Sequence, residues 1–129
     1  MQLVGLTQKK RTMKERKKFF MDRHLAGRKY YDADEVWNEL KVGTVLKLEW
    51  ESDNRYDPNA VAVLYEKKGE KEPYFLGYIP RGNNQIIANM LEMGWEDIFE
   101  CRISKLNPEV HSEGQVHLTI RIKRNSKKR

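Results

Sequence analysis

Cysteine is almost missing from this chain of 129 residues, in which Cys101 is the single example. One cysteine cannot form a disulfide within the chain, so nothing indicates an oxidising compartment. Long apolar runs are missing too. No stretch approaches the roughly 20 residues that a membrane span needs, and residues 1–18 lack the apolar centre of a signal peptide. We therefore expect a soluble, cytoplasmic protein with no membrane partner.

Motifs for metal binding and catalysis are also lacking. His24, His111, His117 and Cys101 do not have the tight spacing of a structural zinc site. There is no Walker-type phosphate loop, and no Ser-His-Asp or Cys-His arrangement can be argued. We expect no metal, no cofactor and no enzymatic activity. A hydrolytic enzyme acting on nucleic acid is an alternative without a supporting motif.

Charge is abundant but unevenly distributed. Residues 1–18 carry a net charge of +6 and residues 121–129 another +6, which leaves −6 for residues 19–120. Basic ends of this kind are typical of arms that seek nucleic acid, although they also improve solubility. The acidic middle argues against a broad duplex-binding face but allows a small pocket with a few local cations.

Apolar periodicity predicts a single, mainly β (α+β) domain over 18–123, between basic tails at 1–17 and 124–129. Alternation and turn residues predict six strands, at 18–27, 44–50, 60–66, 74–79, 99–103 and 116–123. Two helices are expected, at 34–40 and from Asn83 or Asn84 through Met93. Trp37, Trp50 and Trp95 are expected in the core. Many short strands with one buried helix favour a small barrel or curled sheet.

Two short stretches carry the functional information. Asn54-Arg55-Tyr56-Asp57-Pro58-Asn59-Ala60 puts a ring beside a carboxylate at a turn that opens a strand. Ala26-Gly27-Arg28-Lys29-Tyr30-Tyr31 puts two rings directly after two cations. Rings stack on bases, cations hold phosphates, and a carboxylate accepts a hydrogen bond from a hydroxyl. Together they provide what is needed to hold the end of a nucleic-acid strand.

These stretches, followed by Leu76-Gly77-Tyr78-Ile79-Pro80, resemble the HIRAN domain family in order and spacing. The resemblance covers roughly residues 18–123. It implies an OB-like six-stranded β-barrel with two helices. It also implies a non-catalytic module that binds single-stranded DNA at a free 3′ end, in DNA repair or processing.

The resemblance also assigns roles to seven residues. Tyr30 and Tyr56 would flank the last base, with Tyr31 in support. Asp57 would accept a hydrogen bond from the 3′-hydroxyl, and Asn54 would complete that hydrogen bonding. Lys29 and Arg81 would hold phosphates. Lys29 stands where the best-understood members have arginine, and a lysine lacks the bidentate fork of arginine. Residues 105–115 contain no Phe, Tyr or Trp that could stack on a second base.

Each of these residues has a structural alternative. Asp57 could form an Asx-turn, and Asn54 and Asn59 could be turn formers. Tyr30 and Tyr31 could alternate across a strand, while Lys29 and Arg81 could be solvated surface cations. A second functional hypothesis is an adaptor that docks onto a helicase, nuclease or phage-related assembly through its acidic body.

Overall fold

The computed structural model describes residues 16–125, so most of both basic tails lies outside the described part of the chain. Over this range the chain forms six strands, as predicted, together with two short α-helices. The strands are β1 (Lys17–His24), β2 (Val45–Trp50), β3 (Val61–Tyr65), β4 (Tyr74–Tyr78), β5 (Phe99–Leu106) and β6 (Val116–Lys123). All pairings are antiparallel, in the order β1-β6-β5-β2-β3-β4.

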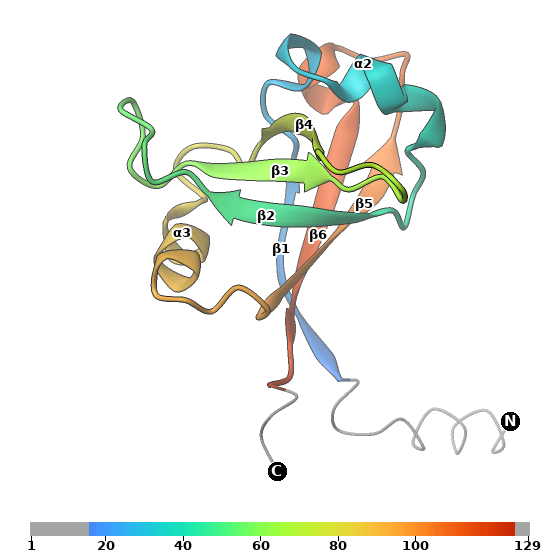
Figure 1. Ribbon diagram of the computed structural model, residues 1–129. Helices are drawn as coiled ribbons and strands as arrows, with labels where there is room; N and C mark the ends of the chain where they lie inside the picture. The colour runs from blue at the N-terminus through green and yellow to red at the C-terminus, as the bar shows by residue number, and fades with distance from the viewer. Residues whose placement is uncertain (1–15, 126–129) are drawn as a thin grey trace, which may run out of the picture.

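The sheet folds over on itself. In Figure 1, β2 and β3 run across the long β1, β6 and β5, and both ends of the described chain leave at the same pole of the molecule. The two edge strands meet at one point, where Ala26 and Tyr78 form an isolated antiparallel bridge. Both backbone N–H···O bonds of that bridge measure 2.9 Å. The architecture is therefore OB-like and mainly β, but it lacks a continuous ladder between β1 and β4.

Gly77 makes this approach of the edges possible. Its φ is +155°, and a Cβ atom built on it would collide with the carbonyl oxygen of Ala26. Only glycine lets the two backbones come this close, because it has no side chain. The glycine of the Leu76–Pro80 motif thus has a packing role at the junction of the two edges.

The core lies between the crossed strands and follows the expected alternation. Val116, Leu118 and Ile120 of β6 are fully buried, and so are Val61 and Val63 of β3. β3 is buried on both faces over most of its length, which explains its continuous apolar run. Trp37 and Trp50 are partly buried against this core, as expected. The expectation for Trp95 was wrong, because it lies after α3 with 54% of its surface exposed.

The predicted helices are present but shorter. The first splits into α2 (Ala33–Val36) and a 3₁₀ helix, η3 (Trp37–Glu39), and the second is α3 (Gln85–Glu92). The chain also forms the 3₁₀ helices η2 (Arg28–Tyr30) and η4 (Ser112–Gly114). The predicted strand 18–27 ends earlier, at His24, because the backbone turns at Gly27 into η2. No helix within residues 16–125 has the length and apolar character needed to cross a membrane.

Candidate functional site

The β2–β3 turn is shaped by two short side chains that bond to their own backbone. The Oδ1 atom of Asn54 accepts hydrogen bonds from the backbone N–H groups of Tyr56 and Asp57, both at 2.9 Å. Oδ1 of Asp57 in turn accepts from the N–H of Asn59 at 2.9 Å. Such Asx bonds are the reason that Asn and Asp concentrate in turns. The turn-forming alternative for Asn54 and Asp57 is therefore confirmed, and the turn leaves the Tyr56 ring 85% exposed.

The second carboxylate oxygen of Asp57 reaches the start of α3. Its Oδ2 accepts a hydrogen bond from Nδ2 of Asn84 at 2.9 Å, and Asn84 is buried. Each oxygen of an ionised carboxylate has two lone pairs, and these two bonds use one on each. Asp57 is itself only partly buried. It therefore keeps acceptor capacity while it joins the turn to the helix.

Two further side chains hold the backbone of this turn. A terminal nitrogen of the Arg81 guanidinium donates to the carbonyl oxygen of Tyr56 at 2.9 Å. Nε1 of Trp50 donates to the carbonyl oxygen of Pro58 at 2.8 Å. Arg81 is thus more than a solvated cation, although its bond to one carbonyl uses only part of the five-donor fork of arginine.

The second motif forms a tight turn and not a strand. Gly27 has a φ of +75°, and Tyr30 N–H donates to its carbonyl at 3.0 Å, which starts η2. The Gly27 N–H lies 2.9 and 3.2 Å from the two carboxylate oxygens of Glu113. The alternative in which Tyr30 and Tyr31 alternate across a strand is therefore wrong. The Tyr30 ring is 70% exposed, and the Lys29 ammonium lies 5.3 Å from its centroid.

The two cations before the tyrosines have separate environments. Arg28 is buried, with its guanidinium 4.1 Å from the Trp37 ring centroid and a terminal nitrogen 2.8 Å from the Asp34 carboxylate. Because Arg28 is used inside the domain, only Lys29 of the pair is presented next to an exposed ring. The sequence motif contains two cations, but only Lys29 remains accessible to a ligand.

Tyr31 packs against an aromatic cluster on β4 while 39% of its surface stays exposed. Its ring lies 4.2 Å from that of Phe75 and 5.8 Å from that of Tyr78, measured between centroids. Phe75 and Tyr78 pack edge to face at 5.1 Å. Such contacts add about 0.5–1.5 kcal/mol per pair beyond burial. Tyr31 thus anchors the end of η2 to the sheet, a supporting position for the exposed ring of Tyr30 before it.

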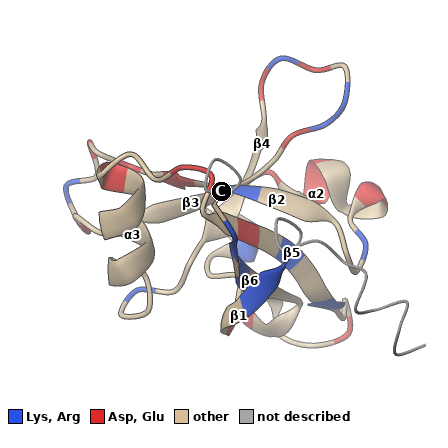
Figure 2. Cartoon of the chain, turned by 90° about the horizontal axis from the view of Figure 1, so that it is seen from below, with Lys and Arg blue, Asp and Glu red and all other residues tan. Residues whose placement is uncertain are grey.

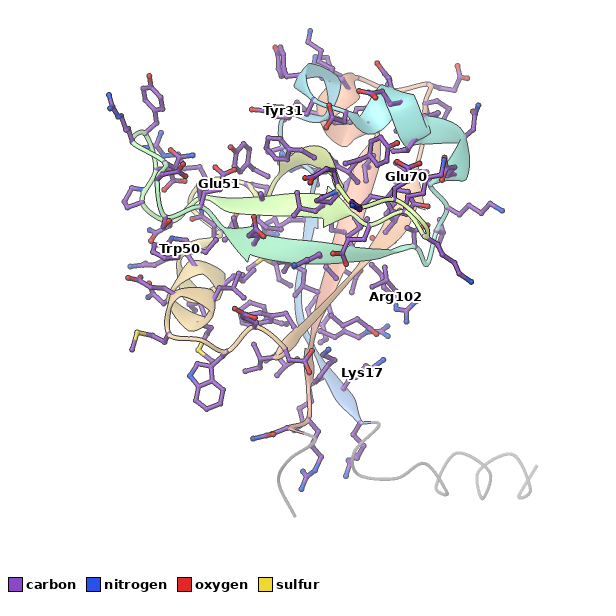
Figure 3. All side chains as sticks on the ribbon, viewed as in Figure 1. Lys17, Tyr31, Trp50, Glu51, Glu70 and Arg102 are labelled. Atoms are coloured by element: carbon purple, nitrogen blue, oxygen red, sulfur yellow. The ribbon has the colours of Figure 1, made fainter. Side chains whose placement is uncertain are left out.

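A hydrogen-bond chain connects this cluster with the β2–β3 turn. The hydroxyl of Tyr78 donates to Oε1 of Glu51 at 2.7 Å, and Nδ2 of Asn54 donates to the same oxygen at 3.1 Å. Burial, followed by the bond to Glu51, raises the pKa of Tyr78, so it stays protonated as a donor. Figure 3 shows Glu51 at the end of β2 with Tyr31 above it. The two sequence motifs are therefore connected through Tyr78 and Glu51.

The structure thus groups the seven predicted residues into two connected sets. Asn54, Tyr56, Asp57 and Arg81 meet at the turn, while Lys29, Tyr30 and Tyr31 meet at η2. Sequence reasoning missed the residues that connect and support these sets, which are Glu51, Phe75, Tyr78, Asn84 and Glu113. Tyr78 lies within the Leu76–Pro80 motif, but nothing in the local sequence indicates its partner Glu51.

These residues form an exposed surface without a metal cage. Among residues 16–125, no group of three His, Cys, Asp or Glu side chains is arranged to hold a metal ion. Burial raises the pKa of the Cys101 thiol to about 12, so this thiol is not a ready nucleophile. A groove of about 570 Å³ runs along β2 beside Leu91 and Phe99, but none of the seven predicted residues lines it.

Comparisons with known proteins agree with this architecture. The family model described as the HIRAN domain matches residues 18–124. A crystal structure of a protein from Lactobacillus plantarum superposes with a TM-score of 0.66 at 24% sequence identity, covering 84% of this chain and 98% of the other. At that identity the likeness concerns the fold alone. No curated protein matches the sequence.

Proposed function

The chain belongs to the HIRAN domain family, and on that premise we propose that it captures single-stranded DNA by a free 3′-hydroxyl end. HIRAN domains bind nucleic acid and are typically non-catalytic, which supplies the class of ligand. One observation carries the finer proposal: the hydrogen-bond chain from Tyr78 through Glu51 to Asn54 connects the two motifs. A strand end recognised there would serve DNA repair or processing.

The exposed rings of Tyr30 and Tyr56 provide the binding energy in this proposal. A ring left in water at 70% or 85% exposure contributes little to the core, so it is available for a ligand. The terminal base would lie between the two rings, since stacking gives about 1–3 kcal/mol per base by alanine substitution. Tyr31, packed on Phe75, supports the segment that carries Tyr30.

Asp57 provides the selectivity for a free end. The remaining lone pairs of its carboxylate can accept a hydrogen bond from a 3′-hydroxyl, and such charge-assisted bonds give roughly 1.5–3 kcal/mol. A 3′-phosphate or an internal phosphodiester would instead bring an anion to the carboxylate. The same side chain therefore raises the affinity for a strand with a free 3′-hydroxyl and lowers the affinity for a strand whose end is blocked. Asn54 acts by positioning, because both lone pairs of its oxygen are already used by the turn.

The cations provide the phosphate contacts. Arg81 is fixed by its bond to the Tyr56 carbonyl and keeps further N–H donors for a phosphate beside the stacked base. Lys29 stands next to the Tyr30 ring and offers a point charge with less directional preference than arginine. Stacking and phosphate contact would thus come from neighbouring side chains at both motifs.

Alanine variants of the two rings test this proposal. Fluorescence anisotropy with a short labelled oligonucleotide bearing a 3′-hydroxyl should show Tyr30→Ala and Tyr56→Ala each weakening binding by about 1–3 kcal/mol. Ile86→Ala is the matched control, because it removes an exposed apolar side chain that is not among the seven predicted residues. All three variants should unfold within about 0.5 kcal/mol of wild type. Unchanged affinity in both tyrosine variants would contradict the proposal.

A second candidate function is an adaptor for a helicase or nuclease. Ile86, Met93 and Trp95 are exposed on and after α3, and Glu92 and Glu96 lie among them. Exposed apolar side chains with a charged rim are typical of protein-binding surfaces. After nuclease treatment of a host extract, a protein retained by wild type but not by Trp95→Ala would favour this function over DNA capture.

A further inference from the structure

An exposed ring lies among cations at the pole where both ends of the described chain leave the domain. Phe19 of β1 is 66% exposed, and its cross-strand partner in β6 is the exposed residue Arg121. Directly opposite residues in an antiparallel pair lie on the same face, with Cβ atoms about 4.5–5.5 Å apart. The ring and the guanidinium-bearing side chain therefore project from one surface of the sheet.

More basic residues lie on this same outer surface. Lys17 is paired with Lys123 across β1 and β6, and Lys17 Nζ reaches across the sheet to Glu100 of β5 at 2.7 Å. Arg102 also contacts Glu100, at 3.2 Å, and Lys123 contacts Asp97 at 2.9 Å. We call this surface the basal face; its charged residues are Lys17, Arg102, Arg121, Lys123, Asp22, Glu100 and Asp97. Its four cations and three acids give a net charge of +1.

The basal face lies at the opposite pole from the candidate end site. In Figure 1 the described chain begins and ends below the sheet, whereas η2 and α2 lie above it. Figure 2, seen from below, shows Lys and Arg gathered on β5 and β6. The two regions are separate surfaces of one domain, and a ligand on one does not need the other.

The chemistry of the basal face fits a single nucleic-acid strand. Exposed rings among cations stack bases while the cations hold the backbone phosphates, and this binding tolerates any sequence. The partly buried acid Glu100 does not oppose it, because Lys17 and Arg102 already neutralise its carboxylate. Charge complementarity therefore favours a polyanion over a protein partner at this surface.

We propose that the basal face is a second nucleic-acid site, which stacks a base of single-stranded nucleic acid on Phe19 and holds adjoining phosphates through Arg121 and its neighbours. Stacking and phosphate contacts involve no terminal hydroxyl, so this site needs no free end. The domain would then hold the interior of a strand at one pole, independently of any terminus at the other.

A circular single-stranded oligothymidylate tests this proposal, because it has no end for Tyr56 and Asp57 to read. The full chain should bind the circle, and Phe19→Ala should weaken that binding by about 5- to 150-fold, as expected for one stacked base. Phe19→Trp keeps a ring and should retain wild-type affinity. Arg121→Ala should make the slope of log K against log salt concentration less steep by about 0.7.

Matched controls separate this surface from the rest of the chain. Ile86→Ala removes an exposed apolar side chain elsewhere, and Lys71→Ala removes an exposed cation from the β3–β4 loop; both should leave binding of the circle unchanged. No binding of the circle, or binding that Phe19→Ala and Arg121→Ala leave unaltered, would overturn the proposal. Binding of the circle together with equal affinity for 3′-hydroxyl and 3′-phosphate ends would overturn end capture but not the basal site.

Discussion

Replacing Asp57 by asparagine removes its charge while preserving most of its geometry. The new Oδ1 can still accept from the Asn59 N–H, as the carboxylate does at 2.9 Å. The new amide nitrogen would face Nδ2 of Asn84, and rotation of the Asn84 amide would present its oxygen instead. Because each bond keeps a partner, we expect Asp57→Asn to cost about 1 kcal/mol of unfolding free energy. Asp57→Ala should cost more, about 1–3 kcal/mol, because it leaves a buried amide of Asn84 without a partner.

The effect of Asp57→Asn on binding should exceed its effect on stability. Loss of a charge-assisted bond worth roughly 1.5–3 kcal/mol lowers the affinity for a 3′-hydroxyl end about 12- to 160-fold. Affinity for a 3′-phosphate end should stay level or rise, because the repelling carboxylate is gone. The ratio of the affinities for the 3′-hydroxyl and 3′-phosphate ends should therefore fall, because the first affinity decreases and the second does not.

Anisotropy titrations with two oligonucleotides that differ only in the terminal group measure this ratio directly. Asp53→Asn is a matched control, because Asp53 is an exposed acid in the same turn. It removes the same charge from the neighbourhood without touching the proposed acceptor. Wild-type discrimination in Asp57→Asn, or an equal loss in Asp53→Asn, would refute the reasoning.

Three further variants probe the junction of the sheet edges, the η2 turn and the ion pairs of the basal face. Gly77→Ala places a methyl group against the Ala26 carbonyl, so it should cost about 1–3 kcal/mol in thermal unfolding; a stable variant would mean that the bridge is not required. Glu113→Ala frees the Gly27 N–H and should weaken 3′-end binding while the melting temperature changes little; wild-type binding would exclude this positioning role. Burial raises the pKa of Glu100, but its bonds from Arg102 and Lys17 outweigh this and hold the pKa below its usual 4.5. Its stabilisation is therefore complete above about pH 4.5 and is lost as pH falls through the lowered pKa. Melting temperatures of wild type and Glu100→Gln should converge as pH falls from 6 to 3, and a constant difference would contradict the assignment.

The alternation of apolar and polar residues was sufficient to predict the six strands. The alternation of Val116, Leu118, Ile120 and Ile122 predicts β6 with its observed bounds, because each inward position is apolar. The N-terminal strand was predicted three residues too long, since Gly27 turns the backbone at a positive φ that alternation does not encode. The exposure of Trp95 could not be predicted either, because the type of a residue does not say whether a helix end faces the core.

Local turn chemistry was predictable, but its distant partners were not. The Asn54–Asn59 stretch predicts an Asx-stabilised turn from residue type alone. The bonds from Tyr78 to Glu51 and from Asn84 to Asp57 each join residues 27 positions apart. Such pairs form only when β4 and α3 pack against the β2–β3 turn, so they depend on tertiary structure. The burial of Arg28 against Trp37 could not be predicted for the same reason, because it too depends on tertiary structure.

One affinity ratio tests the central claim most directly. It compares the binding of wild-type protein to a short single strand that ends in a 3′-hydroxyl with its binding to the same strand ending in a 3′-phosphate. If the carboxylate of Asp57 accepts from the terminal sugar, the hydroxyl end should bind at least about tenfold more tightly, as expected from a charge-assisted bond. Equal affinity for the two ends would contradict end capture.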